Sequence, residues 1–178
     1  MLHRKFFKRP TLVVAKELLG KYLVRKIGTK TIALKVTEVE AYDGPRDRAS
    51  HAVRGKTVRN APMFGPAGQC YIYFTYGIHW MLNIVTGPEN YPAAILIRGT
   101  DRVSGPARLT KFLHIDKKLN EKPATRKTGL WFEDRGERVG SRQIKRAPRV
   151  GVAYAGPVWS KKLYRFVLLG YQTYKTSK

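Results

Sequence analysis

Two carboxylates, a phenol and an imidazole lie close together in the segment 37–51, TEVEAYDGPRDRASH. Glu38, Glu40 and Tyr42 end a predicted strand, and His51 ends the loop that follows an Asp-Gly-Pro turn. Such groups can accept, donate or hold protons. Groups at a junction between strand and loop are fixed by the scaffold yet open to a ligand. The segment is therefore a candidate active site; the alternative is that each glutamate is a solvated or ion-paired side chain, as most glutamates are.

The direction of these side chains depends on whether the strand is regular. Side chains alternate along a strand, so three apolar residues share one face: Ile32, Leu34 and Val36. Without a bulge, the two glutamates and Tyr42 fall on that same core-facing side, where carboxylates need either partners or a function. A bulge near Thr37 would instead turn Val39 and Ala41 towards the core.

Positive charge dominates the composition. The 178 residues include 35 Lys and Arg but only 12 Asp and Glu, which gives a net charge of +23 and a pI near 10.4. Such a chain is attracted to polyanions, with nucleic acid the first candidate and an anionic membrane surface the second. Because the charge is spread along the sequence, we expect a folded basic face rather than a disordered arm. The apolar content of 43% suits one domain over residues 1–178.

Several other classes of protein have little support. The single Cys70 excludes an intramolecular disulfide and is expected to fill the core. No CxxC, HxH or HExxH spacing is present, so no metal site is expected. No apolar run reaches the roughly 20 residues that cross a bilayer, and the basic N-terminus lacks the apolar stretch of a signal peptide. We therefore expect no membrane partner and an intracellular location. A phosphate-cradling glycine loop, as found in many enzymes of small molecules, is also missing.

The elements that would position the segment 37–51 follow from periodicity and turn residues. A core helix is expected to begin with Thr11 as its cap and to stop at Gly20. Strands over 21–27 and 31–42 should then form a hairpin around a Gly-Thr-Lys turn.

A long loop and three strands are expected next. The loop 43–66 contains the stretch RGKTVRN, which either binds phosphates or is a solvated polar loop. Strands are predicted within 68–77, 78–85 and 93–98. Tyr76 stands at a strand tip before a glycine, where it is either pushed outwards as a wedge or packed in the sheet.

Two polar residues on the predicted strands and a second helix also bear on the site. A buried Asn83 or Arg98 needs hydrogen-bond partners, so each is either a structural cross-link or a pocket group. The second helix should have Ser104 as its cap and an apolar stripe that includes Leu109 and Phe112.

The last third of the chain has weaker signals. Residues 115–148 are charged and rich in turn residues, so we expect loops and short strands. The segment 149–156 is a glycine-punctuated strand or tight turn, and 164–169 should be a strand that closes the sheet.

A set of short motifs runs through nearly the whole chain in one order: Leu18-Leu19-Gly20; Glu38-Val39-Glu40-Ala41-Tyr42 with Gly44-Pro45 and His51; Arg59-Asn60 with Met63-Phe64; Tyr71-Ile72-Tyr73 with Tyr76-Gly77; Asn83; Arg98; Ser104-Gly105-Pro106; and Arg149-Val150-Gly151-Val152 with Tyr154-Ala155-Gly156. Each motif is weak alone, but the set in this order and spacing is highly specific. It resembles the alkyladenine (3-methyladenine) DNA glycosylase family.

The resemblance implies a base-excision-repair hydrolase that cleaves the N-glycosidic bond of flipped-out alkylated or deaminated purines, of the 3-methyladenine, 7-methylguanine and hypoxanthine type. It implies a single-domain α+β fold with a curved, mostly antiparallel sheet, flanking helices and long loops. The implied partner is double-stranded DNA containing damaged purines, with no cofactor and no obligatory protein partner, and we expect a monomer. Because no lysine stands within the motifs as a Schiff-base nucleophile, hydrolysis should occur without strand cleavage.

The resemblance also implies roles for individual residues. Glu40 would be the general base that activates water, with Arg98 and the backbone carbonyl of Val150 helping to hold that water. Three residues would sandwich and hydrogen-bond the extruded base: Tyr42, His51 and Tyr73. Asn83 would limit the entry of normal guanine, and Tyr76 would fill the gap left in the duplex. The other implied contacts with DNA are Thr57, Arg59, Met63, Ile78, His79 and Arg108.

Two residues depart from the family pattern. Arg108 replaces an expected lysine but keeps its positive charge, so a phosphate contact would have a different geometry. His79 stands where an aromatic or apolar residue is common, so its contact with DNA would differ in kind.

The competing hypothesis is a basic nucleic-acid-binding protein without catalytic activity. It accounts for the charge but not for the Glu, Tyr and His side chains gathered in the segment 37–51. The two hypotheses differ in whether Glu40→Gln abolishes an activity or changes nothing.

Overall fold

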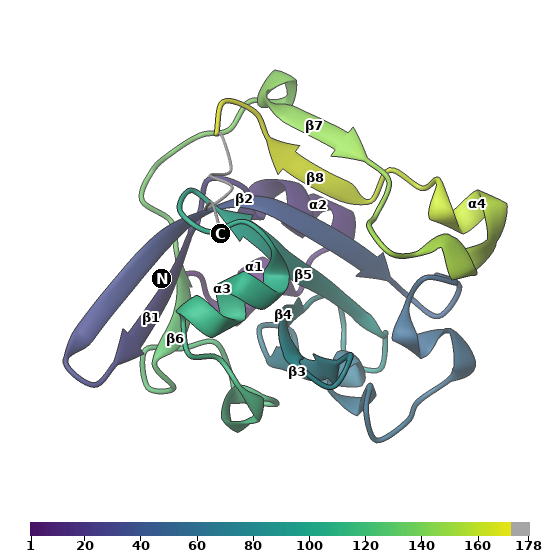
Figure 1. Cartoon of the computed structure of the whole chain (residues 1–178), viewed down its shortest axis with the longest axis horizontal. Coiled ribbons are helices and arrows are strands. Elements are labelled where there is room, and N and C mark those ends of the chain that lie inside the picture. Colours follow the sequence, from purple (N-terminus) through teal and green to yellow (C-terminus); the bar gives the residue numbers. More distant parts are fainter. Residues whose placement is uncertain (172–178) are drawn as a thin grey trace.

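The computed structural model describes residues 1–171, and within them eight strands and four α-helices form an α+β fold (Figure 1). The strands are β1 (Tyr22–Ile27), β2 (Lys30–Asp43), β3 (Cys70–Thr75), β4 (His79–Val85), β5 (Ala93–Thr100), β6 (Leu130–Glu133), β7 (Ile144–Ala147) and β8 (Arg165–Leu168). The helices are α1 (Arg4–Phe7), α2 (Thr11–Leu18), α3 (Pro106–Phe112) and α4 (Gly156–Ser160). The predicted α+β class is confirmed.

The sheet is organised around β2, its longest strand. The strand order is β3-β4-β5-β2-β1-β6, and β8 pairs with both β2 and β7. All of these pairs are antiparallel. The first part of β2, residues 30–35, pairs with β1, whereas residues 36–43 pair with β5. Figure 1 shows β2 crossing the molecule from the β1–β2 hairpin to the loop that follows Asp43.

A β-bulge in β2 decides which way its glutamates point. The register with β5 shifts between Val36 and Glu38 and again between Glu38 and Val39. Val36 and Val39 therefore both pack in the hydrophobic core, and Glu40 lies on the opposite face of the strand. Of the two alternatives that the sequence left open, the strand adopts the one with a bulge near Thr37. The bulge is favoured because it buries valine side chains in the apolar core, where burying carboxylates would cost free energy.

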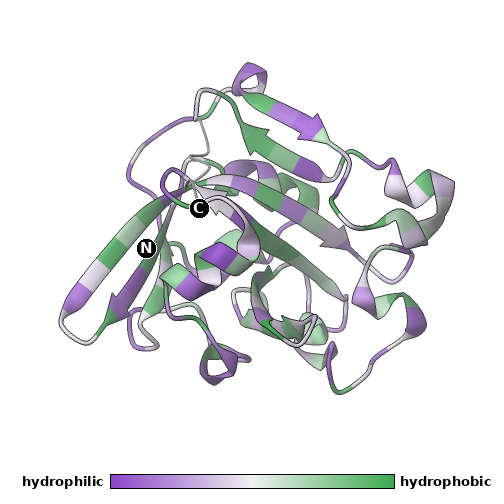
Figure 2. Ribbon diagram, viewed as in Figure 1, coloured by the Kyte–Doolittle hydropathy of each residue, from purple (hydrophilic) through white to green (hydrophobic). Residues whose placement is uncertain are grey.

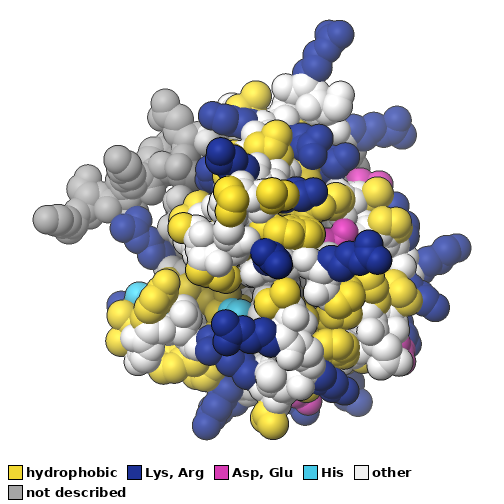
Figure 3. Space-filling model, turned by 90° about the vertical axis from the view of Figure 1, so that its right-hand side faces the viewer, with side chains coloured by type: hydrophobic (Ala, Val, Ile, Leu, Met, Phe, Trp, Pro, Cys, Tyr) yellow, Lys and Arg dark blue, Asp and Glu magenta, His cyan; other side chains and the backbone are white. Residues whose placement is uncertain are grey.

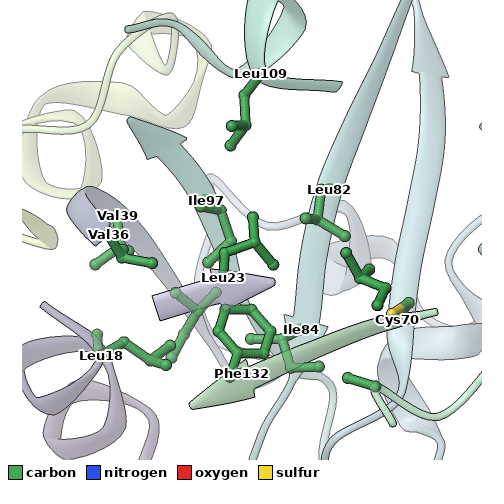
Figure 4. Packing of buried hydrophobic residues seen from close by; sticks show 14 of the residues in the cluster. Leu18, Leu23, Val36, Val39, Cys70, Leu82, Ile84, Ile97, Leu109 and Phe132 are labelled. Atoms are coloured by element: carbon green, nitrogen blue, oxygen red, sulfur yellow. The ribbon is translucent and has the colours of Figure 1, made fainter. Parts of the chain in front are cut away.

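The hydrophobic core gathers side chains from the sheet and from the helices α1, α2 and α3. Leu18 of α2 and Leu109 of α3 belong to the same cluster as Ile97 of β5 and Phe132 of β6, and all four are buried (Figure 4). Figure 2 shows apolar residues along the central strands and polar residues at the tip of the β1–β2 hairpin. Cys70 is buried in the same cluster, as predicted. Removing one such large side chain typically costs about 2–5 kcal/mol, so this core holds the strands that carry the site firmly.

The two predicted helix caps are wrong. Pro10 is the N-cap of α2, and the hydroxyl of Thr11 instead donates to Asp43 Oδ1 at 2.8 Å, which ties the helix to the end of β2. The N-cap of α3 is Gly105, whose φ of 95° lies in the left-handed region that glycine tolerates, and Ser104 bridges to β5. Phe112, predicted in the apolar stripe of this helix, is 44% exposed.

The other predicted elements agree with the structure except in two short helices. The hairpin partners and the later strands match β1, β2, β3, β4, β5 and β8. Residues 115–148 contain loops, the short strands β6 and β7 and two short 3₁₀ helices. The helices α1 and α4 were not predicted, because helices of four and five residues show no apolar period. The segment 149–156 forms turns and a 3₁₀ helix, Ala153–Ala155, rather than a strand.

Candidate active site

A cavity of about 280 Å³ opens beside the second half of β2. This volume is close to the lower end of the range of about 300–1,000 Å³ for small-molecule sites. The wall contains residues from β2 and β5, the β3–β4 hairpin, the loop after β2 and the segment 150–154. Nine predicted site residues line it: Glu40, Tyr42, His51, Met63, Tyr73, Tyr76, Asn83, Arg98 and Val150. Residues spread over more than one hundred positions of the chain thus meet at one hollow.

Glu40 is the acidic residue of the cavity, and its side chain is fully buried. Its Oε1 accepts a hydrogen bond from the backbone N–H of Val150 at 2.7 Å, and its Oε2 accepts one from the Tyr42 hydroxyl at 3.0 Å. Arg98 Nη1 lies 3.4 Å from Oε1. Burial raises the pKa of Glu40 above its ordinary value, against the lowering effects of Arg98, the Val150 amide and Tyr42. A buried carboxylate with two hydrogen-bond donors and a guanidinium beside it can act as a base towards a ligand in the cavity.

The raised pKa predicts that Glu40→Gln stabilises the folded protein at neutral pH. Because the folded-state pKa lies above the ordinary value of 4.5, the stabilisation from protonating Glu40 is present below 4.5. It is lost as the pH rises through the folded-state pKa. At pH 7 the raised pKa of the wild-type side chain therefore costs stability, and neutral glutamine avoids this cost. Thermal unfolding should give a higher melting temperature for the variant at pH 7 and a smaller difference at pH 4. A variant that melts below the wild type at pH 7 would contradict the shift.

Glu38 has a different environment from Glu40, although both lie on β2. Its Oε1 accepts hydrogen bonds from Arg98 Nε at 3.0 Å and from Arg165 Nη1 at 3.1 Å. It does not line the cavity. Arg98 therefore bridges the two carboxylates. Of the two interpretations of these glutamates, the ion-paired side chain applies to Glu38 and the candidate active-site residue applies to Glu40.

Aromatic rings form the walls of the cavity. Tyr42 and Tyr73 both line it, and the ring of His51 meets that of Tyr73 edge-on at 4.7 Å between centroids. His51 Nδ1 lies 3.0 Å from the hydroxyl of Tyr71, a buried residue that the sequence analysis did not assign to the site. Tyr71 could have been assigned to the site from the sequence, because it stands two residues before Tyr73 and therefore shares a face of the strand with it. Partial burial, with a smaller effect from Arg59, lowers the pKa of His51, so its ring is neutral at pH 7.

Asn83 is buried in the cavity wall in a fixed orientation. Its side-chain N–H groups donate to the carbonyls of Tyr71 at 3.1 Å and Met81 at 3.3 Å. The sequence left open whether Asn83 is a structural cross-link or a pocket group. It is both, because it connects β4 to β3 and also lines the cavity.

Tyr76 stands at the tip of the β3–β4 hairpin, at the mouth of the cavity. Its residue is 86% exposed, and the next apolar residue, Ile78, is 68% exposed. Tyr76 and Gly77 have φ values of 52° and 68°, and the N–H of Ile78 donates to the carbonyl of Thr75. Positive φ at both central residues is typical of a tight hairpin turn, but it is uncommon for a tyrosine. The turn therefore points an aromatic ring into solvent, and the alternative of a ring packed in the sheet is excluded.

The loop after β2 is held in place by one residue that the sequence analysis did not assign. Asn60 is buried; its side-chain oxygen accepts from the Thr57 N–H at 2.7 Å, and its N–H groups donate to the carbonyls of His51 and Gly55 at 2.9 Å each. Arg59 lies over the Tyr73 ring at 5.4 Å and donates to the Phe74 carbonyl at 3.0 Å. The loop and the cavity wall thus form one rigid unit.

The remaining residues predicted to contact DNA do not share one setting. Thr57, Arg59, His79 and Arg108 are exposed, whereas Met63 is 2% exposed and forms part of the cavity wall. Figure 3 shows Lys and Arg side chains spread between apolar ones on the face at the right of Figure 1. Such a face suits a polyanion.

Residues 1–171 lack the features of two other classes of site, a metal centre and a membrane span. Within them no group of three or more His, Cys, Asp and Glu side chains could hold a metal ion. No helix in this part of the chain combines the length and the apolar character that a membrane span requires.

Comparisons with known proteins find similar sequences over most of this chain. A family model described as "Methylpurine-DNA glycosylase (MPG)" matches residues 5–104 and 99–172. Three similar proteins are each named "Putative 3-methyladenine DNA glycosylase". The one from Streptomyces avermitilis is 44% identical over 88% of this chain and 84% of its own. The one from Methanocella arvoryzae is 40% identical over 88% and 86%. The one from Legionella pneumophila strain Corby is 40% identical over 94% and 93%.

Proposed function

Because the chain belongs to the methylpurine-DNA glycosylase family, and is thus a DNA-repair hydrolase that acts on DNA, we propose that it hydrolyses the N-glycosidic bond of alkylated or deaminated purines flipped out of duplex DNA. The observation that carries the proposal is the fully buried carboxylate of Glu40 in a cavity walled by Tyr42 and Tyr73. A base inside a duplex is out of reach of such a cavity, so it must be extruded first, at a cost of a few kcal/mol.

Glu40 acts as the general base in this proposal. A water molecule attacks the anomeric carbon of the sugar while the carbon–nitrogen bond to the purine breaks and the purine leaves with the bonding electrons. The proton of the water passes to the Glu40 carboxylate, whose charge also favours the positive charge that develops on the sugar. Arg98, 3.4 Å from the same carboxylate, helps to hold the water, together with the backbone carbonyl of Val150.

The cavity walls select the base. The rings of Tyr42 and Tyr73 stack on the extruded purine, and an alkylated purine with positive charge is attracted to them most strongly. His51, neutral at pH 7, supplies a hydrogen bond. Asn83, fixed by its bonds to two backbone carbonyls, limits the entry of guanine through contact with its exocyclic amine.

The surface around the cavity binds the duplex. Tyr76, exposed on its hairpin tip, fills the space that the base vacates, since stacking between a base and an aromatic ring is worth roughly 1–3 kcal/mol. Five further residues contact the duplex in this proposal: Thr57, Arg59, Ile78, His79 and Arg108. Met63 supports the wall instead. Among residues 1–171 no lysine lines the cavity, which favours hydrolysis without strand cleavage. We further propose that the single domain acts as a monomer without a cofactor.

Single-turnover release of hypoxanthine and of alkylated purines from duplex oligonucleotides tests the proposal. The rate should fall on the acid side as Glu40 becomes protonated. Since burial raises the pKa of Glu40, this loss should be centred above the ordinary value of 4.5. A rate series between pH 4 and pH 9 measures it. No release of any modified purine, together with DNA binding that weakens steeply with salt, would favour the non-catalytic binding protein instead.

A further inference from the structure

We propose that Asp47 and Arg149 form a positioning pair that orients the donors around Glu40. The inference rests on the function proposed above but concerns residues that do not touch the substrate. Neither side chain lines the cavity. Both act through their neighbours, Val150 and Tyr42.

The pair is a buried, two-pronged ion pair. Arg149 Nη1 and Nη2 donate to Asp47 Oδ2 and Oδ1 at 2.5 and 2.8 Å, and both side chains are fully buried. Asp47 also accepts from the backbone N–H groups of Asp43 at 3.1 Å and Ala49 at 3.0 Å. Each carboxylate oxygen therefore receives one arginine and one backbone donor. This arrangement fixes the start of the loop that leads to His51.

Arg149 also connects this loop to β2. Its Nη1 donates to the carbonyl of Ala41 at 2.8 Å, and its guanidinium carbon lies 4.7 Å from the centre of the Tyr42 ring. Arg149 stands directly before Val150, in a segment outside the strands of the sheet. The turn that presents the Val150 amide is therefore held to β2 through the Arg149 side chain.

Two donors to Glu40 depend on this side chain. The Val150 N–H, which belongs to the residue after Arg149, is 2.7 Å from Glu40 Oε1. The Tyr42 hydroxyl, on the ring that Arg149 covers, is 3.0 Å from Oε2. A shift of the guanidinium would move both donors, and with them the direction in which the carboxylate faces the cavity.

The energetics of the pair point to orientation rather than to stability. Burying two charges is expensive, and well-packed apolar residues of similar size often serve stability as well or better. The Nε of Arg149 is buried and has no hydrogen-bond partner among residues 1–171, so the desolvation of the guanidinium is only partly offset. What apolar residues could not provide is a rigid planar fork that contacts a carboxylate, a carbonyl and a ring at fixed angles.

The test combines Arg149→Lys, which keeps the charge but loses the fork, with a direct probe of the Val150 amide. In wild-type protein labelled with ¹⁵N-valine, the chemical shift of the Val150 N–H should change with pH as Glu40 ionises, and Glu40→Gln should remove that change. Arg149→Lys should greatly reduce the amplitude and lower kcat by about 100-fold with KM nearly unchanged, the loss expected when a catalytic group moves by about 1 Å. This probe does not need the protein to excise any base, so it separates the inference from the proposed function.

Arg25→Lys is the matched control. Arg25 cross-links the carbonyls of Leu113, Gly129 and His114 and does not line the cavity. It should lower the melting temperature but leave the Val150 titration and kcat unchanged. If Arg149→Lys does not fold, Asp47→Asn is measured instead, with the same result expected. A folded Arg149→Lys or Asp47→Asn variant that keeps both the wild-type amide titration and the wild-type kcat would overturn the inference.

Discussion

Replacing Glu40 with glutamine should reduce single-turnover release of hypoxanthine from duplex DNA by about 10²–10⁴-fold, the range that a positioned general base contributes. Glutamine has nearly the same size and can still accept the hydrogen bond that Val150 donates to Oε1. It cannot take a proton from water, and it lacks the negative charge that favours a cationic sugar. Binding of the damaged duplex should be preserved, because the tyrosine walls and the basic surface are unchanged. Base release and fluorescence anisotropy on the same oligonucleotide measure the two quantities.

Glu38→Gln is the matched control for this experiment. Glu38 lies two residues earlier on β2, and its carboxylate is bonded to Arg98 and Arg165 rather than exposed to the cavity. The same chemical change there should cost much less activity. Equal losses in the two variants would mean that charge near Arg98, not a base at position 40, matters. An active Glu40→Gln variant would remove the assigned base altogether.

Most strands of the fold could be predicted because they depend on local signals. The hairpin of β1 and β2 follows from two apolar runs around a Gly-Thr-Lys turn, and β3 follows from alternating aromatic residues. The helix caps could not be predicted as well, since the choice between Pro10 and Thr11 was decided by Asp43, a distant partner on β2. The bulge near Thr37 is a similar case, because the pairing of β2 with β5 sets it.

The sequence predicted which residues line the site better than it predicted the hydrogen bonds between them. The motif set named nine residues that the structure brings to one cavity. The amide of Val150 on Glu40 joins residues 110 positions apart, and the pair of Asp47 and Arg149 spans 102 positions. No periodicity or turn residue encodes such contacts. They require the tertiary arrangement of β2 and the segment 149–154. The sequence therefore did not single out Asp47, and it placed Asn60 only in the Arg59-Asn60 motif and in a loop that either binds phosphates or is solvated.

Tyr76→Ala should weaken binding to duplex DNA containing a modified purine by roughly 5–150-fold, the equivalent of the 1–3 kcal/mol that stacking on an aromatic ring contributes. The Tyr76 ring is already exposed, and the backbone of Tyr76 and Gly77 has positive φ. The ring therefore makes little contact with the core and is free to contact a partner. Alanine keeps the turn but leaves the vacated space in the duplex unfilled, so extrusion of the base loses its compensation.

The comparison with single-stranded DNA decides whether Tyr76 acts as a wedge. A single strand has no stacked partner to replace, so the variant should bind it almost as well as the wild type does. Tyr76→Phe keeps the ring and should retain nearly all of the affinity for the damaged duplex. Titrations of the three proteins with both forms of DNA at one salt concentration provide the test, because the salt-dependent phosphate contribution is then the same for the three proteins on each form of DNA. Equal losses of affinity for duplex and single-stranded DNA would mean that Tyr76 is only a general surface contact. Another residue would then have to fill the gap that the extruded base leaves in the duplex.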